Sequence, residues 1–325
     1  MRAAWYEKNG TARDVLTVGD MPAVAPGPGE VRVALKTSGV NPSDVKTRIG
    51  SRPMTAPRIV PHSDGAGTIE SVGAGVPTSR VGERVWIWNG AWKRSFGSAA
   101  EMITLPAEQA VAMPESVSFE AGACLGIPAL TAYRALATDG GVAGASVLVT
   151  GGAGAVGHYA IQMARLMGAA RVIATVSSPA KATHASEAGA DATINYKTDD
   201  VAARLKDLTG GKGVDRIVEV DISGNAALYP SLLARDGIVA AYGSNQRNFE
   251  LTFSPLIASG IAIRFFIVYE LSPSARQDAL ERVSRWLSEG SLRHAIAATY
   301  PLDRIVDAHE TVERGTHVGN VVITL

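Results

Sequence analysis

The chain is poor in cysteine, in uninterrupted apolar runs and in net charge. Cys124 is the only cysteine among 325 residues, so no disulfide can form within the chain and no cysteine-rich zinc site can be built. We expect Cys124 to be a buried, inert thiol. No apolar run reaches the length of about 18 residues that a membrane-spanning helix requires. The sequence therefore predicts neither a disulfide-stabilised protein nor a membrane protein.

The charge of the chain is balanced, with 31 Lys and Arg against 31 Asp and Glu. Zero net charge lacks the electrostatic footprint of a general nucleic-acid-binding protein, so we expect no nucleic-acid partner. The first residues, MRAAWYEKNG, contain no apolar signal core, which predicts a cytoplasmic protein with no membrane partner. The chain is 46% hydrophobic and 19% charged, an ordinary globular composition with room for two domains.

What the sequence does contain is a glycine-rich loop between a predicted strand and a predicted helix. The β-branched run at 146–150 is typical of a buried strand, and GGAGAVG follows at 151–157. Its glycines have the GxGxxG spacing, in which the first permits a turn, the second lets the backbone approach a pyrophosphate, and the third allows close helix packing. The helix N-terminus would then bind the phosphates of a dinucleotide. The predicted pyrophosphate-binding residues are Gly152, Ala153, Gly154, Ala155, Val156 and Gly157.

The next βα unit indicates which dinucleotide binds. The strand predicted at 171–176 ends without the Asp or Glu that would hold the ribose hydroxyls of NAD. Ser177 or Ser178 can cap the following helix, Pro179 suits its first turn, and Lys181 lies beside amides that attract anions. We interpret this segment as a pocket for the 2′-phosphate of NADPH. The alternative is a capped surface helix that carries an ordinary solvated lysine.

The chain divides into two regions of different pattern. Up to residue 122, short strand-like segments alternate with proline and glycine, which predicts a mostly antiparallel β domain. From residue 144, strands alternate with helices, which predicts a doubly wound parallel sheet and an α/β fold. The expected strands are 30–37, 67–72, 84–88 and 99–105 in the first region, and 146–150, 171–176, 192–194, 214–219, 237–242 and 261–268 in the second. A helix over 274–290 and a strand over 320–325 follow.

Several motifs together resemble the medium-chain dehydrogenase/reductase superfamily, in its zinc-free quinone oxidoreductase (zeta-crystallin-like) branch. They are GVNPSDVKTRIG, SDGAGTIESVGAGV, IPALTAYRAL, the glycine loop, and PLDRIVDAHE. The resemblance implies a GroES-like catalytic domain formed by residues 1–124 and 268–325. It also implies a Rossmann NADPH-binding domain over residues 125–267, with the active cleft between the two domains.

The zinc-dependent relatives place metal ligands where this chain has none. They carry a GHE motif where this chain has Ser63 and Asp64, and a cysteine near Val40 or Asn41; their third ligand falls at Ile127-Pro128. His62 lies one residue away from the ligand position, and we interpret it as a capping or wall residue. We therefore expect no metal. Without a Lewis acid, hydride passes most readily to quinones or conjugated enones, which spread the developing charge themselves.

The resemblance also implies cofactor contacts outside the glycine loop. Asn41 resembles a residue beside the nicotinamide ribose, and Thr131 resembles a hydroxyl near the nicotinamide. The residues that resemble the 2′-phosphate site are Ser177, Lys181, Tyr196 and, from the other domain, Arg314. Those that resemble the nicotinamide half of the site are Gly243, Ser244, Phe266, Ile267 and Val268, with simple core packing as the alternative for the last three. No residue is assigned as a catalytic acid, base or nucleophile.

The chain departs from the family where many members have tyrosine after the Asn-Pro motif. Lys46, Arg48 and Arg52 bring positive charge towards the predicted substrate cleft, beside Asn41. This cluster could steer an anionic acceptor or stabilise a developing enolate or quinolate oxygen. Solvated loop cations are the alternative. The functional hypotheses are therefore a quinone or enone reductase, a 2-enoyl thioester reductase, or a non-catalytic NADPH-binding structural or RNA-binding protein.

The segment IAIRFFIVYEL, at 261–271, is apolar and β-prone, and we expect it at the edge of the parallel sheet. An exposed edge of this kind invites pairing with another chain. The family resemblance implies that two copies of the chain pair there across a two-fold axis, so the sequence predicts a homodimer.

Overall fold

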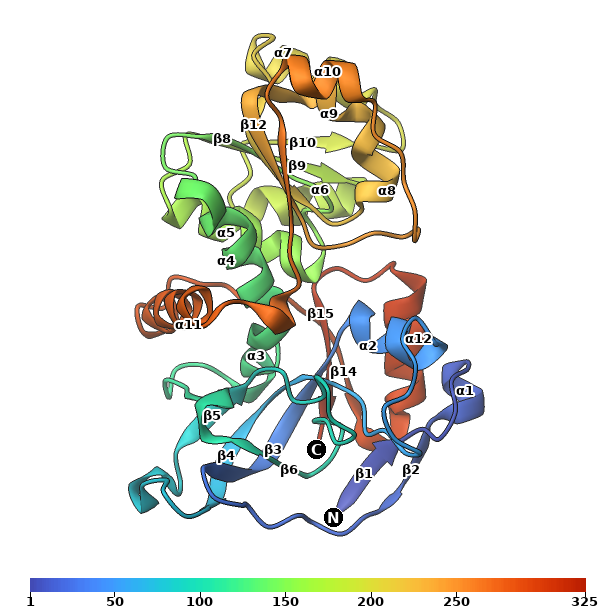
Figure 1. Ribbon diagram of the computed structural model, residues 1–325, viewed down its shortest axis with the longest axis vertical. Coiled ribbons are helices and arrows are strands. Elements are labelled where there is room, and N and C mark those ends of the chain that lie inside the picture. The colour runs from blue at the N-terminus through green and yellow to red at the C-terminus, as the bar shows by residue number, and fades with distance from the viewer. The chain divides into compact units, whose positions relative to one another are not determined.

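The structure is a computed structural model that describes all residues from Met1 to Leu325. The chain forms two compact units. Unit 1 comprises Met1–Pro128 and Ser284–Leu325, and unit 2 comprises Ala129–Val283. Figure 1 shows a mainly β unit formed by both ends of the chain and an α/β unit formed by its middle.

Unit 1 contains a seven-stranded, largely antiparallel sheet. Its strand order is β14-β15-β3-β4-β5-β7, and β6 pairs with β3. The long strand β3 is central because it pairs antiparallel with β4, β6 and β15. The strands are β3 (Glu30–Val40), β4 (Asp64–Val72), β5 (Arg84–Ile87), β6 (Met102–Pro106), β7 (Ala110–Ala112), β14 (Ile296–Pro301) and β15 (Asn320–Thr324). A separate pair is formed by β1 (Arg2–Trp5) and β2 (Thr17–Asp20).

The helices of unit 1 are short and come from both ends of the chain. They are α1 (Ala12–Val15), α2 (Pro42–Ile49), α3 (Phe119–Gly122) and α12 (Ile305–Arg314). The buried face of α12 carries Ile305, Ala308 and Val312, which pack in one apolar cluster with Val40 and Val45. A second apolar cluster, around Val33, Ile69 and Ile103, is formed by side chains of the sheet strands. The C-terminal helix is therefore part of the same core as the N-terminal β domain.

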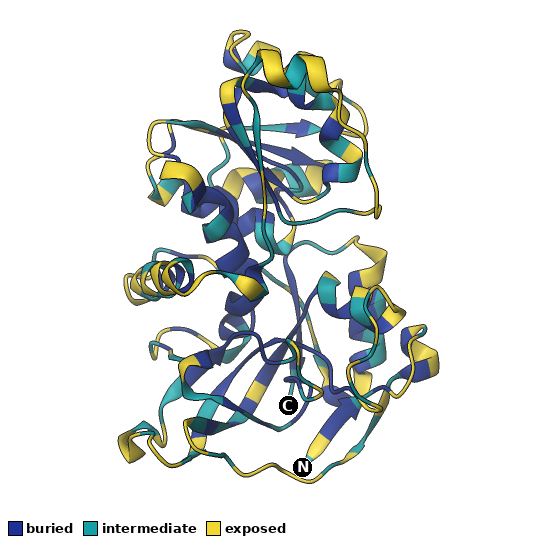
Figure 2. Ribbon diagram, in the orientation of Figure 1, coloured by how far each residue is buried: buried dark blue, intermediate teal, exposed yellow.

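Unit 2 is a doubly wound parallel sheet with strand order β10-β9-β8-β11-β12-β13. The chain runs outward from β8 in one direction and from β11 in the other, so the strand order reverses between them, where such folds bind ligands. The strands are β8 (Ser146–Val149), β9 (Arg171–Val176), β10 (Ala192–Asn195), β11 (Val214–Glu219), β12 (Leu233–Ala241) and β13 (Ala262–Phe265). Figure 2 shows that the central strands are buried, and their core includes Leu148, Ile173 and Ile217.

The helices of unit 2 are α4 (Leu130–Ala137), α5 (Ala155–Leu166), α6 (Pro179–Glu187), α7 (Val201–Thr209), α8 (Ile222–Asn225), α9 (Tyr229–Leu232), α10 (Phe253–Ala258) and α11 (Pro273–Ser288). Most of them connect successive strands, whereas α4 precedes β8 and α11 follows β13. The predicted α/β fold class is confirmed, and so is the position of the 261–268 segment at a sheet edge, where β13 lies. No helix in the structure is both long and apolar enough to cross a bilayer.

Two details differ from the sequence-based expectations. Unit 2 extends past the expected boundary at 267, because the first half of α11 is tied to it. The Tyr133 hydroxyl donates to Asp278 Oδ2 at 2.7 Å, and Arg276 donates to the carbonyl of Val268. The second detail is that strands β1, β2, β7 and β14 were not expected. In β14, the alternating half-buried and exposed residues are weakly apolar.

Candidate functional site

The glycine-rich loop joins β8 to α5 in unit 2 as the sequence predicts. Gly152 N donates to Thr175 O of β9 at 2.9 Å, which holds the loop beside that strand. A Cβ atom on Gly157 would lie 2.3 Å from Gly151 O and 2.8 Å from Gly152 Cα, so no side chain fits there. A Cβ atom on Gly154 would meet only Gly151 O, at 3.3 Å, and that side of the loop is open. The loop therefore has the tight packing and the open backbone that a phosphate cradle requires.

Helix α5 begins without a side-chain cap. Gly154 is its N-cap residue and has extended backbone angles, and no side chain accepts from the first-turn amides. Ala155 and Val156 are half-buried, whereas Ala153 is buried under the loop. An uncapped helix N-terminus presents free N–H groups and a partial positive charge, which suits a phosphate.

The end of β9 lies beside the start of α6. Either Ser177 or Ser178 could cap α6 according to the sequence. The structure assigns the N-cap to Ser178, whose Oγ accepts from Lys181 N at 3.3 Å. Tyr196 N donates to Val176 O at 3.1 Å, which places Tyr196 next to this strand end, and its side chain is 52% exposed. Ser177 and Lys181 are half-buried in the same turn. These residues therefore gather at one corner of the sheet, without a carboxylate at the end of β9.

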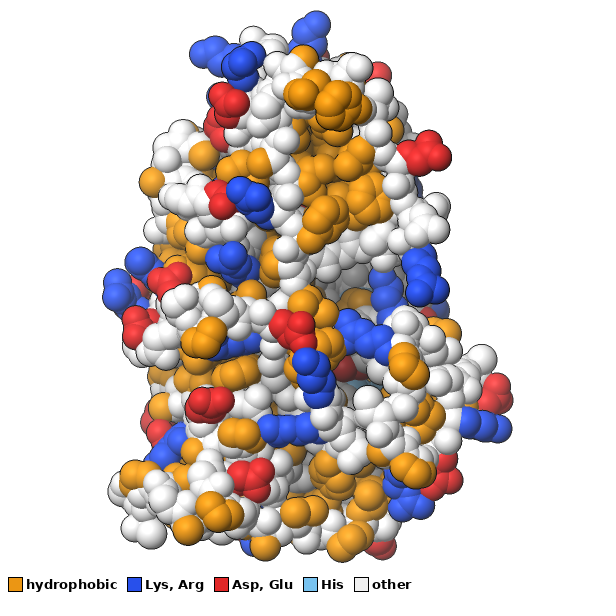
Figure 3. Space-filling view, in the orientation of Figure 1, with side chains coloured by type: hydrophobic (Ala, Val, Ile, Leu, Met, Phe, Trp, Pro, Cys, Tyr) orange, Lys and Arg blue, Asp and Glu red, His pale blue; other side chains and the backbone are white.

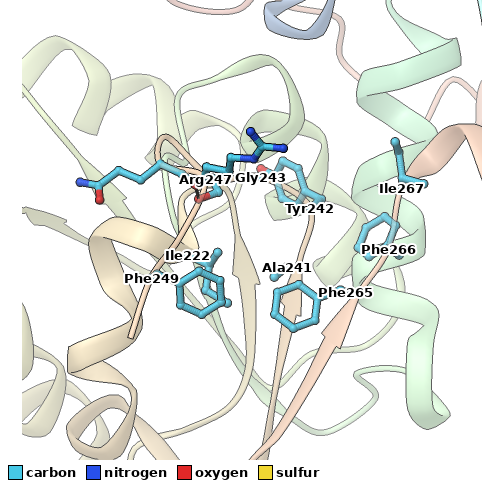
Figure 4. A pocket seen from close by; sticks show the side chains of 11 residues that line it. Ile222, Ala241, Tyr242, Gly243, Arg247, Phe249, Phe265, Phe266 and Ile267 are labelled. Atoms are coloured by element: carbon cyan, nitrogen blue, oxygen red, sulfur yellow. Dashed lines mark hydrogen bonds between the residues drawn. The ribbon is translucent and has the colours of Figure 1, made fainter. Parts of the chain in front are cut away.

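The carboxyl ends of β12 and β13 border a pocket of about 550 Å³ within unit 2. Four residues predicted for the nicotinamide half of the site line it: Gly243, Ser244, Phe266 and Ile267. Val268 is buried and does not line it. The other lining residues are Ile222, Ala241, Tyr242, Gln246, Arg247, Phe249 and Phe265 (Figure 4). A Cβ atom on Gly243 would lie 2.1 Å from Val220 O, so glycine is required where the chain leaving β12 passes the residue that follows β11.

The loop after β12 is fixed by one carboxylate. Asp221 accepts from Asn245 N at 2.9 Å, from Asn245 Nδ2 at 2.7 Å and from Ser223 Oγ at 2.5 Å. Burial raises the pKa of Asp221, but the hydrogen bonds from Ser223 and Asn245 outweigh burial and leave the pKa below its ordinary value. A charged Asp221 therefore holds the backbone that follows Gly243.

Glu219 ends β11 at the point where the strand order reverses. Its side chain is fully buried and accepts from Thr150 Oγ1 at 2.9 Å, Asn225 Nδ2 at 2.9 Å and Tyr229 Oη at 3.0 Å. Asp221 N donates to the same carboxylate at 2.7 Å. Glu219 is absent from the site residues predicted from the sequence. A carboxylate that ends an apolar strand next to the glycine-loop strand was the available signal.

Thr131 lies in α4 of unit 2 and is buried. Asn41 lies in unit 1, at the N-cap of α2, and its side chain forms a hydrogen bond inside that unit. Asn41 Nδ2 donates to Asp64 Oδ2 at 2.9 Å, and Ile127 N donates to the same oxygen at 3.0 Å. Asn41 N donates to Asp44 Oδ2 at 2.8 Å. Asn41 thus bridges two buried carboxyl groups that the sequence analysis did not connect.

The pKa values of these two carboxyl groups are raised. Burial raises the pKa of Asp44 to about 7, although hydrogen bonds from Asn41 oppose the shift. Burial also raises the pKa of Asp64 well above its ordinary value, and the nearby Asp44 adds to the effect. No cationic side chain bonds to either group, so they hold protons more readily than exposed carboxyl groups do.

A chain of buried side chains surrounds His62. His62 Nδ1 lies 2.9 Å from Ser38 Oγ, and His62 Nε2 lies 2.9 Å from His309 Nε2. Ser38 Oγ in turn lies 2.9 Å from Ser98 Oγ, which donates to Asp64 O at 2.6 Å. Both nitrogens of His62 therefore have protein partners. No group of three His, Cys, Asp or Glu side chains in the chain is placed to hold a metal ion.

The predicted cation cluster is not one cluster. Arg48 is fully buried, forms an ion pair with Glu313 of α12 and donates to Gly10 O at 2.6 Å. The prediction that Arg48 faces a substrate is therefore corrected, because its charge is neutralised inside unit 1. Arg52 stacks over Trp92, with its guanidinium carbon 4.5 Å from the ring centroid, and Lys46 is exposed on α2.

Arg314, the remaining predicted phosphate contact, is exposed at the C-terminal end of α12 in unit 1. It donates to Thr311 Oγ1 at 2.8 Å. Cys124 is buried, and burial raises the pKa of its thiol well above the ordinary value, as expected for an inert cysteine.

The two units and the glycine loop define a GroES-like β domain joined to a dinucleotide-binding α/β domain. The family described as "Alcohol dehydrogenase GroES-like domain" matches residues 27–115, and that described as "Zinc-binding dehydrogenase" matches residues 155–288. The human quinone oxidoreductase is 30% identical over 309 residues, which cover 94% of this chain and 92% of that protein. This chain belongs to the quinone oxidoreductase branch of the medium-chain dehydrogenase/reductase superfamily.

Solved structures agree over the whole chain. An NAD-dependent alcohol dehydrogenase superposes with a TM-score of 0.91 at 29% identity, and 100% of each chain is covered. The Escherichia coli quinone oxidoreductase complexed with NADPH superposes with a TM-score of 0.88 at 25% identity, again over 100% of each chain. The chain is therefore a medium-chain oxidoreductase in fold and in family.

Proposed function

We propose that this chain is an NADPH-dependent reductase of quinones or conjugated enones that works without zinc. The observation that carries the proposal is the environment of Asp64. Its Oδ2 atom is occupied by Asn41 Nδ2 and Ile127 N, and the neighbouring Ser63 and Ile127 side chains are poor zinc ligands. A site without a Lewis acid needs an acceptor that is already electron-poor. Quinones and enones meet that requirement.

The residues of unit 2 fit a dinucleotide. The open Gly154 side of the loop and the uncapped first turn of α5 would hold the pyrophosphate. Ser177, Lys181 and Tyr196 would surround a 2′-phosphate, and the absence of a carboxylate at the end of β9 favours NADPH over NADH. The Escherichia coli relative with bound NADPH supports this choice of cofactor.

The nicotinamide end would lie at the pocket beyond β12 and β13. Bound NADPH would supply a hydride, and the acceptor, taking that hydride and one proton from solvent, would become a hydroquinone or a saturated ketone. The protein's part is to position the cofactor and the acceptor. Gly243 and Ser244 offer backbone atoms, Phe266 and Ile267 shape the apolar wall, and Asp221 keeps the loop in place. Asn41, Thr131 and Arg314 are proposed as further cofactor contacts.

The test is NADPH oxidation against matched acceptors. Quinones and conjugated enones should be reduced, whereas saturated ketones of similar size should not, because nothing polarises their carbonyl. Enoyl thioesters belong in the same panel, since their reduction would indicate the alternative thioester activity. Reduction of saturated ketones, or no reduction of any quinone or enone, would overturn the proposal.

We further propose that the protein is a homodimer. Strand β13 is an unpaired edge of the parallel sheet. Phe253 and Ile257 of α10 are 72% and 63% exposed. Figure 3 shows apolar side chains gathered on the face of unit 2. An uncovered edge beside such side chains favours pairing with a second copy.

A further inference from the structure

The pocket at the ends of β12 and β13 combines aromatic walls with a single cation. Phe249, Phe265 and Phe266 line it together with Tyr242, and the Phe249 and Phe265 rings lie 6.2 Å apart between centroids. A volume of about 550 Å³ is in the range of small-molecule sites, which are mostly apolar with a few placed polar groups. Flat, conjugated molecules suit such walls because aromatic rings pack against one another.

Arg247 is the only charged side chain that lines this pocket. It is exposed and has no ion pair, hydrogen bond or ring contact within the protein. Two other arginines of unit 2 differ in this respect: Arg216 donates to Ala135 O and Thr138 O, and Arg264 pairs with Asp139 at 2.6 Å. Figure 4 shows the Arg247 side chain among those that line the pocket. The guanidinium is therefore available to a ligand.

Hydrogen bonds fix the backbone of Gln246, the residue before Arg247. Gln246 N donates to Ser223 Oγ at 3.1 Å, and Ser244 Oγ donates to Gln246 O at 2.6 Å. Asp221, the nearest carboxylate in this network, is already satisfied by Asn245 and Ser223, so it does not compete for the guanidinium. A fixed backbone with a free cationic side chain reduces the ordering cost of binding an anion.

We propose that Arg247 binds an anionic group on the acceptor, so that the preferred substrates are planar conjugated acceptors carrying a carboxylate or sulfonate. This inference rests on the proposed function, whose active site it extends. A guanidinium pairs with such anions through two parallel hydrogen bonds, which a lysine ammonium cannot reproduce. Arg247 thus takes the part that was predicted for Arg48, which is buried in unit 1.

The experiment compares 1,4-naphthoquinone with 1,4-naphthoquinone-2-sulfonate, which share a ring and differ in charge. Arg247→Gln should raise KM for the sulfonate by about tenfold, the usual scale of a charged hydrogen bond that solvent partly screens. Its KM for the neutral quinone should stay within about twofold, since only apolar walls contact that ring. The KM of Arg247→Lys for the sulfonate should fall between those of the wild type and Arg247→Gln. The difference in KM between the wild type and Arg247→Gln should shrink at high salt.

Arg235→Gln is the matched control, because Arg235 is an exposed arginine of the same unit that does not line the pocket. Its Nε atom lies 3.9 Å from Asp236 Oδ2. This variant should leave both KM values unchanged. Equal effects of Arg247→Gln on the two quinones would overturn the inference. A weaker NADPH affinity in Arg247→Gln with unchanged acceptor KM would also overturn it, since Arg247 would then contact the cofactor.

The inference and the proposed function fail separately. Absence of turnover with either quinone contradicts the proposed function. Binding of the sulfonate, followed by quenching of protein fluorescence, still tests Arg247 without any turnover. Equal dissociation constants for the wild type and Arg247→Gln in that titration would contradict the inference.

Discussion

The Nε2 atoms of His62 and His309 lie 2.9 Å apart inside unit 1, and the two rings stack with centroids 5.1 Å apart. The contact joins the segment before β4 to helix α12, near the C-terminus. His62 reaches it with a positive φ of 75°, a conformation that costs free energy in a residue other than glycine. Since one proton must lie between the two nitrogens, the contact depends on the protonation state of both rings.

Acid should therefore destabilise the protein through this pair. Burial lowers the pKa of His62 to about 3, and burial, His62 and Arg48 together lower the pKa of His309 well below its usual range. An unfolded histidine titrates near about 6.5, so the unfolded chain binds protons first as the pH falls. We expect the free energy of unfolding to decrease from about pH 6.5 towards about pH 3, the window set by these pKa values.

The variant His309→Gln should flatten that acid limb, because it removes one titrating ring. The measurement is the slope of the unfolding free energy against pH, obtained from urea titrations, so a constant loss of stability does not matter. His317→Gln serves as control, since the His317 ring lies outside the His62–His309 pair and its Nδ1 atom lies 3.2 Å from the Thr311 carbonyl oxygen. An acid limb of unchanged slope in His309→Gln would show that the pair does not set acid stability.

The buried carboxyl groups should act in the opposite direction. The folded-state pKa of Asp44 is about 7, above the unfolded value of about 3.9, so folding takes up a proton between these values. This contribution to stability is present at low pH and is lost as the pH rises towards 7. Asp44→Asn should remove that loss, whereas the exposed Asp20→Asn should not. Urea titrations from pH 5 to 8 would contradict this if the two variants gave the same slope.

The glycine loop could be predicted from the sequence, whereas the buried contacts of Arg48 and His62 could not. The glycine loop and its flanking strand and helix could be predicted because all their constraints lie within about one βα unit. Arg48 could not, since its partner Glu313 lies 265 residues later in the chain. Its spacing beside Lys46 suggested an exposed cation, and only the packing of α12 against α2 buries it. The His62–His309 contact spans 247 residues and was equally invisible.

The loop after β12 shows a related limit. Gly243 and Ser244 were predicted from the resemblance, whereas Arg247 was not, because only the folded chain shows that its side chain lines the pocket. The fold was predictable from alternation of strands and helices. The charges that remain available to ligands were not, because side-chain pairing is decided by tertiary contacts.

Cofactor choice depends on the corner formed by β9 and α6. Lys181→Ala should weaken NADPH binding by about tenfold, the scale of one charged hydrogen bond, and leave NADH binding nearly unchanged. Lys212→Ala, at an exposed position elsewhere on unit 2, is the control. Fluorescence titration gives the dissociation constants of NADPH and NADH for the wild type and both variants. Equal wild-type affinities for NADPH and NADH would show that this corner does not select the phosphate.

The edge strand β13 should carry the dimer contact. Ile263→Lys places a charge on that edge strand, where Ile263 packs against the core of unit 2, and should give monomers or insoluble protein, because an unpaired lysine is costly to bury. Light scattering at micromolar concentration measures the mass directly. A monomeric wild type under those conditions would count against the dimer.

The central claim is that this chain passes hydride from NADPH to a quinone or enone without a metal ion. The most direct measurement is the rate of NADPH oxidation with 1,4-naphthoquinone, on one protein sample before and after removal of metals by a chelator. We predict turnover with the same rate in both states, and no stoichiometric zinc in the purified protein. Loss of turnover on chelation with recovery on added zinc would contradict the account.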